Sequence, residues 1–234
     1  GANGNGQFFW FNAATNGVML QTPPTGAYST FYSENFGGAT VAAGGTMSGS
    51  ANLLNYPGQL QVFDNVTNQV GGLTVAAGVN ASAYMVDFDL ITSTGADGIS
   101  YSFGDDVNAN AITPTQEKGS GSKLKISFDA YGAAMPNAQG IYLLYNNTAG
   151  SFNNTTPGVL AYSNDISWVN DTSHVSISID NAGKLSLAVG ATTIFNGVQL
   201  PAAYLAANKA TWSHVISGRT GAITMLATID NLLI

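Results

Sequence analysis

Cysteine is absent from the 234-residue chain, and charged side chains are scarce. Without cysteine the protein has no disulfide, no thiol nucleophile and no cysteine-ligated zinc site. Only 8% of the residues are charged, where about 25% is usual for soluble domains. Serine, threonine, asparagine, glutamine and glycine must therefore solvate much of the surface. This composition favours a secreted or cell-surface bacterial protein over a cytosolic enzyme.

Basic residues are the scarcer charged class, with 6 Lys and Arg against 13 Asp and Glu and a formal net charge of −7. Such a charge repels phosphate backbones and anionic membranes, so nucleic acids and lipid surfaces are poor candidate partners. The nearest approach to a basic patch is the small group Lys118, Lys123 and Lys125. No run of eighteen apolar residues occurs, so we expect no membrane insertion.

Helical periodicity is almost absent, and residues 202–210 form the best, short helix candidate. Alternation of apolar and polar residues recurs instead, and this period of two predicts β-strands. The clearest alternating segments are residues 99–103, 124–128, 175–179, 185–189 and 223–229. Residues 181–183 predict a turn, and Asn196-Gly197 predicts a two-residue hairpin turn.

Strands that recur about every ten residues, separated by Gly, Asn and Asp, predict an all-β fold. We expect a two-sheet antiparallel β-sandwich or jelly roll. The glycine-rich residues 37–54 predict loops and weak edge strands. No linker or repeat is visible, so a single domain over residues 1–234 is the simplest account. The opening letters GANGNGQ have the composition of a trimmed end, and we expect a domain excised from a larger secreted protein.

Five segments, in the same order along the chain, are similar to the concanavalin A-like superfamily of L-type (legume-like) lectins and laminin-G-like domains. They are GADGISYSFG (95–104), LKISFDAYG (124–132), GIYLLYNN (140–147), HVSISIDNAGKLSLAV (174–189) and VISGRTGA (215–222). The resemblance spans residues 84–234, whereas residues 1–80 are compatible but not distinctive. It implies a two-sheet jelly roll whose ligand site lies in loops at one sheet's edge or concave face.

Asp97, followed by Gly98, matches the lectin aspartate that accepts hydrogen bonds from two sugar hydroxyls. An ionised carboxylate suits this role because its two oxygens are strong acceptors. The parity of Asp97 with Ile99 and Tyr101 places it on the core-facing side of the strand. The alternative is an Asp-Gly turn residue that bonds its own backbone.

Asp129 matches the aspartate that bridges calcium and a transition metal in the lectins. Calcium needs six to eight oxygen ligands, and this loop offers Asp129, the carbonyl of Tyr131 and Asn137. The metal-ligating glutamate of the family corresponds to Ser127, so we do not expect the double-metal site. One calcium ion stays open as a cofactor, and otherwise Asp129 is a structural acid.

The remaining candidate ligand-binding residues are Tyr131, Asn137, Arg219 and Thr220. The resemblance implies that the Tyr131–Asn137 loop supplies an aromatic platform and an amide, and that Arg219-Thr220 closes the site. Arg219 is the only arginine, and its guanidinium suits carboxylated or diol ligands. Alternatively it ties its loop to Asp230 or to another acid.

Catalytic machinery is not visible. Glycosidases need two suitably placed carboxylates, but Asp87 and Asp89 read as a solvated strand face, and Glu34 and Glu117 are the only glutamates. We therefore expect no enzyme. The leading hypothesis is a carbohydrate-binding module that binds glycans or cell-surface polysaccharide for adhesion. The alternative is a structural or protein-interaction module with a vestigial sugar site, and a glycanase is third.

Overall fold

The computed structural model describes residues 29–54, 58–108, 116–131, 139–148, 153 and 155–234. The chain divides into two compact units, residues 1–31 and residues 32–234. The second unit contains every strand and helix that the structure describes. A single domain over residues 1–234 stays a prediction.

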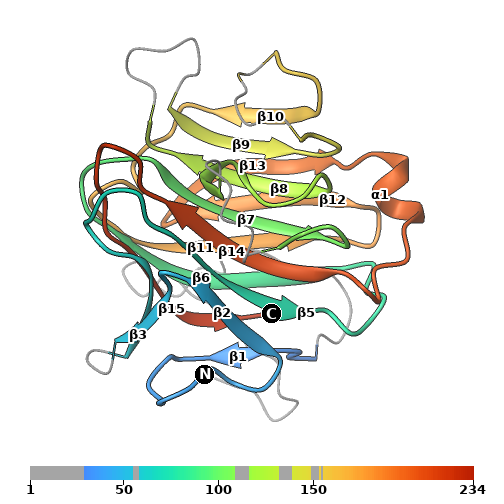
Figure 1. Ribbon diagram of the computed structural model, residues 1–234. Helices are drawn as coiled ribbons and strands as arrows, with labels where there is room; N and C mark the ends of the chain where they lie inside the picture. Colours follow the sequence, from blue (N-terminus) through green and yellow to red (C-terminus); the bar gives the residue numbers. More distant parts are fainter. Residues whose placement is uncertain (1–28, 55–57, 109–115, 132–138, 149–152, 154) are drawn as a thin grey trace, which may run out of the picture. The chain divides into compact units, whose positions relative to one another are not determined.

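Two antiparallel sheets form two layers of the second unit (Figure 1). The eight-stranded sheet has the order β13 (Thr192–Gln199), β12 (Lys184–Val189), β11 (Thr172–Ile179), β6 (Tyr84–Thr92), β15 (Ala227–Leu233), β4 (Gln59–Phe63) and β3 (Asn52–Leu54), and β1 (Ser33–Glu34) also pairs with β15. The seven-stranded sheet has the order β10 (Val159–Ser163), β9 (Gly140–Leu144), β8 (Leu124–Asp129), β7 (Gly98–Gly104), β14 (Ser213–Arg219), β5 (Val70–Ala76) and β2 (Gly45–Gly49). The predicted all-β sandwich is confirmed.

Alternation along each strand explains how the sheets pack. Ile99, Tyr101 and Phe103 of β7 lie in the core that the two sheets share. Ser100 and Ser102, which alternate with them, lie on the outer face of the seven-stranded sheet, where Ser100 bonds to Ser217 of β14. Both serines are nevertheless buried, so this polar outer face is covered by other parts of the chain.

Helical structure among the described residues is limited to the short helix α1 (Ala202–Ala206) and the 3₁₀ turn η1 (Gln116–Lys118). Helix α1 confirms the helix predicted at 202–210 but is shorter, and Pro201 stands at its N-cap. None of the described helices has the length and apolarity needed to cross a membrane.

The hairpin predicted at Asn196-Gly197 is wrong, because β13 runs through both residues. Leu185 pairs with Val198 and Leu187 with Phe195, so β13 carries one extra residue at this point. Gly197 has a φ of 65°, the left-handed conformation that many bulges require. The chain turns at Gly190 instead, between β12 and β13.

The last predicted strand also starts too early. Ile223 lies outside β15 and is 51% exposed, whereas the alternation from Met225 onward is buried as expected. The glycine-rich residues 37–54 do contain edge strands, since β2 and β3 each end one sheet.

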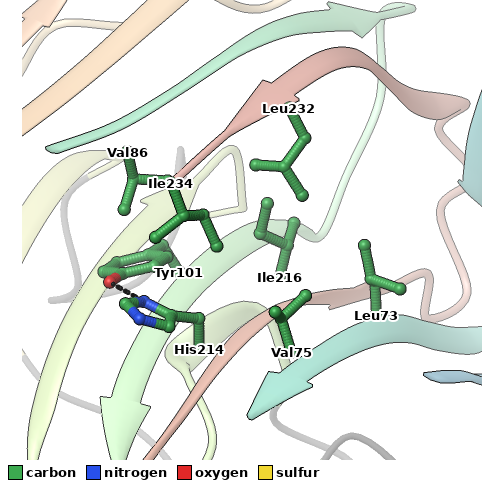
Figure 2. Close-up of a pocket in the computed structure, with 8 residues that line it drawn as sticks. All are labelled: Leu73, Val75, Val86, Tyr101, His214, Ile216, Leu232 and Ile234. Atoms are coloured by element: carbon green, nitrogen blue, oxygen red, sulfur yellow. Dashed lines mark hydrogen bonds between the residues drawn. The ribbon is translucent and has the colours of Figure 1, made fainter. Parts of the chain in front are cut away.

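A cavity of about 10 Å³ lies between the two sheets (Figure 2). It is lined by Leu73, Val75, Val86, Tyr101, His214, Ile216, Leu232 and Ile234. The Tyr101 hydroxyl and His214 Nδ1 are hydrogen-bonded at 2.8 Å beside it. Burial lowers the pKa of His214 to about 3. The space is about that of one water molecule, so it is a packing feature of the core and not a sugar site.

Candidate functional site

Three neighbouring strands bring the candidate residues to one end of the seven-stranded sheet. Gly98 at the start of β7 pairs with Asp129 on β8 and with Arg219 on β14. The Asp97 N–H donates to the Arg219 carbonyl at 3.3 Å, and the Ala130 N–H donates to the Asp97 carbonyl at 2.8 Å. Asp97 therefore lies between the ends of β8 and β14, as the lectin resemblance implies for a site built from these loops.

Gly98 permits this close approach of main chains. Its φ is 150°, and a Cβ atom there would lie 2.1 Å from the Phe128 carbonyl oxygen. The Ala96–Asp97 peptide bond that precedes it is cis. Gly98 thus contributes backbone geometry to the site, and no other residue type fits without moving β8.

The Asp97 carboxylate is ion-paired with Arg219. Arg219 Nη2 lies 2.9 Å from Asp97 Oδ2, and Arg219 Nε donates to Glu117 Oε2 at 2.7 Å. Arg219 follows the parity of Ser217 on the outer face, so the Asp97 carboxylate joins this polar face and not the core side that its parity predicted. Of the two alternatives for Arg219, the structure shows the pairing with acids, although the partners are Asp97 and Glu117 and not Asp230.

Burial dominates the electrostatics of both acids. Asp97 is 4% exposed, and burial raises its pKa while Arg219 and Lys118 oppose that shift. Burial likewise raises the pKa of Glu117 to about 7, against the opposing effect of the same two cations. A buried acid keeps its charge only when a cation lies beside it, and here one guanidinium serves two acids.

Asp129 is fully buried and is also ion-paired. Its Oδ2 accepts from Lys118 Nζ, and its Oδ1 accepts from the Tyr131 N–H at 3.0 Å. Burial raises the pKa of Asp129, and Lys118 counteracts the shift. Asp129 is therefore held at the β8 terminus by a lysine from the turn η1, eleven residues earlier in the chain.

The turn η1 covers the polar outer face of the sheet and carries Glu117 and Lys118 into the site. The Ser127 hydroxyl donates to the Glu117 carbonyl at 2.7 Å, and the Ser120 N–H donates to Ser102 Oγ at 2.9 Å. Serines that alternate with core residues on β7 and β8 thus anchor the covering segment. We refer to Asp97, Glu117, Lys118, Asp129 and Arg219 as the charge network.

Glu117 and Lys118 belong to the charge network, although the sequence did not predict this. In the sequence Glu117 is one of only two glutamates, and Lys118 belongs to the nearest approach to a basic patch. The structure buries Lys118 and Lys125, and Lys125 Nζ donates to the Asn147 carbonyl at 2.6 Å. The only signal was an adjacent Glu-Lys pair in a chain poor in both residues.

The other predicted site residues that the structure describes, Tyr131 and Thr220, differ in their exposure to solvent. Tyr131 is 44% exposed. Thr220 is buried, and its hydroxyl donates to the Val66 carbonyl and accepts from the Gln69 N–H at 3.0 Å, so it anchors two loops to each other. Asn137 lies outside the described residues.

Asp87 and Asp89 lie elsewhere, on the outer face of the eight-stranded sheet. His174 Nδ1 is 2.8 Å from Asp89 Oδ1, and His174 Nε2 is 3.7 Å from Asp87 Oδ1. Asp87 is 3% exposed, so the solvated strand face expected from the sequence holds for Asp89 but not for Asp87. These acids do not join the charge network.

The donor groups around Asp129 determine whether a metal ion can bind at this end of the sheet. Within the described ranges, no group of three or more His, Cys, Asp or Glu side chains is placed to hold a metal ion. Both oxygens of Asp129, the expected ligand, are engaged by Lys118 and by the Tyr131 N–H. The described donors therefore do not fit calcium as they stand.

Comparisons of sequence identify no relative: no protein-family model matches, and neither does any curated protein. Comparison of structure identifies proteins of similar fold. The metal-free VIP36 exoplasmic/lumenal domain has a TM-score of 0.63 at 15% identity, covering 87% of this chain and 90% of that one. The Emp46p carbohydrate recognition domain in its potassium-bound form has a TM-score of 0.63 at 12% identity, covering 86% and 95%.

The Emp47p carbohydrate recognition domain gives a TM-score of 0.60 at 14% identity, covering 86% of this chain and 93% of that one. The chain therefore has the concanavalin A-like fold of L-type lectin domains, and the resemblance seen in five sequence segments is confirmed at the level of fold. VIP36 has been solved in Ca²⁺-bound and in Ca²⁺/mannose-bound forms.

Proposed function

We propose that the protein is a non-catalytic carbohydrate-binding module. The observation that carries the proposal is the meeting of three strand ends at Asp97. Its main-chain N–H and C=O bond to the Arg219 carbonyl and the Ala130 N–H, and its carboxylate pairs with the Arg219 guanidinium. The fold is that of domains crystallised with mannose and with oligomannose fragments. The fold supports glycan binding as a function, and the chemistry of Asp97 supports this end of the sheet as the proposed site.

Each residue has a defined part in the proposed site. The Asp97 carboxylate accepts hydrogen bonds from vicinal sugar hydroxyls, and Arg219 fixes its orientation. Gly221 leaves room for a ligand beside the Asp97 carboxylate, since a Cβ there would lie 2.9 Å from Asp97 Oδ2. The half-exposed Tyr131 ring offers an apolar face on which a pyranose can stack. Asn137 supplies an amide in this proposal, and Thr220 holds the loop.

The proposed setting is outside the cytoplasm, on a secreted or cell-surface protein that adheres to glycans. Composition supports this location, and VIP36, which shares the fold, is described as exoplasmic or lumenal. A shallow polar site of this kind binds weakly, with Kd of about a micromolar to a millimolar. Several copies on one surface would supply the avidity that adhesion needs.

One observation favours a second candidate, a protein-interaction or structural module. Asp97 is 4% exposed and already paired with Arg219, so part of its acceptor capacity is used within the fold. In that case the charge network is purely structural and the sugar site is vestigial.

Glycan binding separates the two candidates. The wild-type protein is screened on a glycan array that includes oligomannose, and positive ligands are titrated by calorimetry. We expect Tyr131→Ala to weaken binding at least about fivefold, taking for a stacked sugar the value of about 1–3 kcal/mol that stacking on an aromatic side chain has for a nucleic-acid base. Tyr131→Phe should retain binding. Asp97→Asn should abolish binding, and the exposed Asp105→Ala is the matched control.

Two results would favour the second candidate. The first is a wild-type protein that binds no glycan on the array. The second is an Asp97→Asn variant that is folded and binds as tightly as wild type. Sustained cleavage of a polysaccharide would instead point to the third candidate, a glycanase.

A further inference from the structure

Both oxygens of the Asp129 carboxylate are engaged by groups of the chain itself. Lys118 Nζ pairs with Oδ2, and the Tyr131 N–H donates to Oδ1 at 3.0 Å. The side chain of Asp129 is 0% exposed and that of Lys118 is 8% exposed. The pair is therefore shielded from water. In such a buried place an ammonium and a carboxylate interact more strongly than at a surface.

The lysine lies where a cation would have to bind. A calcium ion at Asp129 needs six to eight oxygen donors, but a fully buried carboxylate beside an ammonium group offers it neither space nor net negative charge. Ser127, the residue next along the outer face of β8, gives its hydroxyl hydrogen to the Glu117 carbonyl. The residue before Lys118 is thus fixed to the same strand as Asp129.

A second cation adds to the compensation of charge. Arg219 lies between Asp97 and Glu117, so the two basic groups of the network, Lys118 and Arg219, face three acids. They come from η1 and β14, which both contact the strands that carry the site. The VIP36 domain has been solved with bound Ca²⁺, whereas here the positive charge is present in covalently attached side chains.

We propose that the Lys118 ammonium group takes the place of a metal ion at Asp129, so that this end of the fold is ordered without any divalent cation. Lys118 is a positioning residue: it neutralises Asp129, which holds the Tyr131 N–H, and it fixes η1 over the outer face of the sheet. Its effect on ligand binding rests on the proposed function, whereas its effect on folding does not.

Thermal unfolding tests the folding part without any ligand. We expect the melting temperature of the wild-type protein to change by less than about 2 °C when EDTA or millimolar CaCl₂ is added. Lys118→Met should lower it by roughly 10 °C, because one partner of a buried pair is left uncompensated. Lys123→Met is the matched control, since Lys123 is more exposed and lies 3.9 Å from Asp105, and it should change little.

A double substitution keeps the proposal testable if Lys118→Met fails to fold. Lys118→Met with Asp129→Asn removes both charges, and we expect this protein to be more stable than Lys118→Met alone. Stabilisation of the wild type by calcium, or equal melting temperatures for Lys118→Met and Lys123→Met, would overturn the proposal.

Failure of this proposal and failure of the proposed function are distinguishable. If the melting data hold and the array shows no glycan binding, Lys118 replaces the metal in a module that is not a lectin. If glycans bind only when calcium is added, the function stands and the role given to Lys118 is wrong.

Discussion

Arg219 holds Asp97 through both side chain and main chain. Its Nη2 lies 2.9 Å from Asp97 Oδ2, and its carbonyl oxygen accepts the Asp97 N–H at 3.3 Å. The end of β14 and the start of β7 are therefore joined twice at the same place. Because Arg219 Nε also reaches Glu117, the loop before β7, the turn η1 and β14 are linked through one guanidinium.

Removing this guanidinium should destabilise the fold. Arg219→Met leaves Asp97 and Glu117 buried beside each other with less positive charge, and breaking a buried pair costs about 3–5 kcal/mol. We expect the urea midpoint to fall accordingly, with part of the loss recovered in Arg219→Lys. A midpoint equal to that of the control Lys123→Met would contradict the role given to Arg219.

Gly98 should tolerate no side chain. In Gly98→Ala the new Cβ would lie 2.1 Å from the Phe128 carbonyl oxygen at a φ of 150°, so β7 and β8 must separate where Asp97 and Asp129 meet. Gly44→Ala is a matched control, because Gly44 has a φ of 95° but no atom within 4 Å of an added Cβ. Strain of φ alone costs about 1–3 kcal/mol, and we expect Gly98→Ala to lose clearly more in denaturant titrations.

Acid should destabilise the protein through His214. Burial lowers the pKa of His214 from 6.5 to about 3, so between these values the unfolded chain binds a proton that the folded chain does not. The contribution of this histidine to the free energy of unfolding therefore decreases as the pH is lowered, by about 1.4 kcal/mol per pH unit.

His214→Phe removes that dependence. The variant loses the bond with Tyr101, so it should be less stable than wild type at neutral pH, and its deficit should shrink as the pH falls from 6 to 4. Urea titrations at each pH measure the difference. A constant difference would show that His214 is protonated in the folded state.

His174 should give the opposite sign. The carboxylates of Asp87 and Asp89 beside the ring raise the pKa of His174, against the effect of burial. The stabilisation is fully present below about pH 6.5 and is lost as the pH rises through the raised pKa. His174→Gln should therefore be most destabilised relative to wild type in acid and nearly equal to it at high pH. Melting temperatures across this range check the trend.

The sequence predicted the fold well because alternation is a local signal. Ile99, Tyr101 and Phe103 face the core as their spacing predicts. Local signals failed where pairing with another segment decides the outcome. Asn196-Gly197 has the letters of a hairpin turn, yet β12 pairs across it and makes it a bulge. The alternation of side chains between the two faces also holds only within β7, which begins at Gly98. Asp97 precedes the strand, and its carboxylate joins Arg219 on the outer face and not the core.

The candidate site was predictable only in part for the same reason. Asp97, Asp129 and Arg219 lie on strands with recognisable patterns, and the sheet places them side by side. Glu117 and Lys118 lie in a segment without periodicity, and their positions depend on serines of β7 and β8 that bond to it. Nothing within that segment shows where it will pack.

The charge network also constrains how such a sequence can diverge. Five of the chain's 19 charged residues (6 basic and 13 acidic) depend on one another in one buried site, so a change at any one of them is costly unless another changes with it. We expect Lys118 and Asp129 to be inherited or lost together among descendants of this chain. A descendant that acquired metal ligands on β8 would have to give up the lysine first.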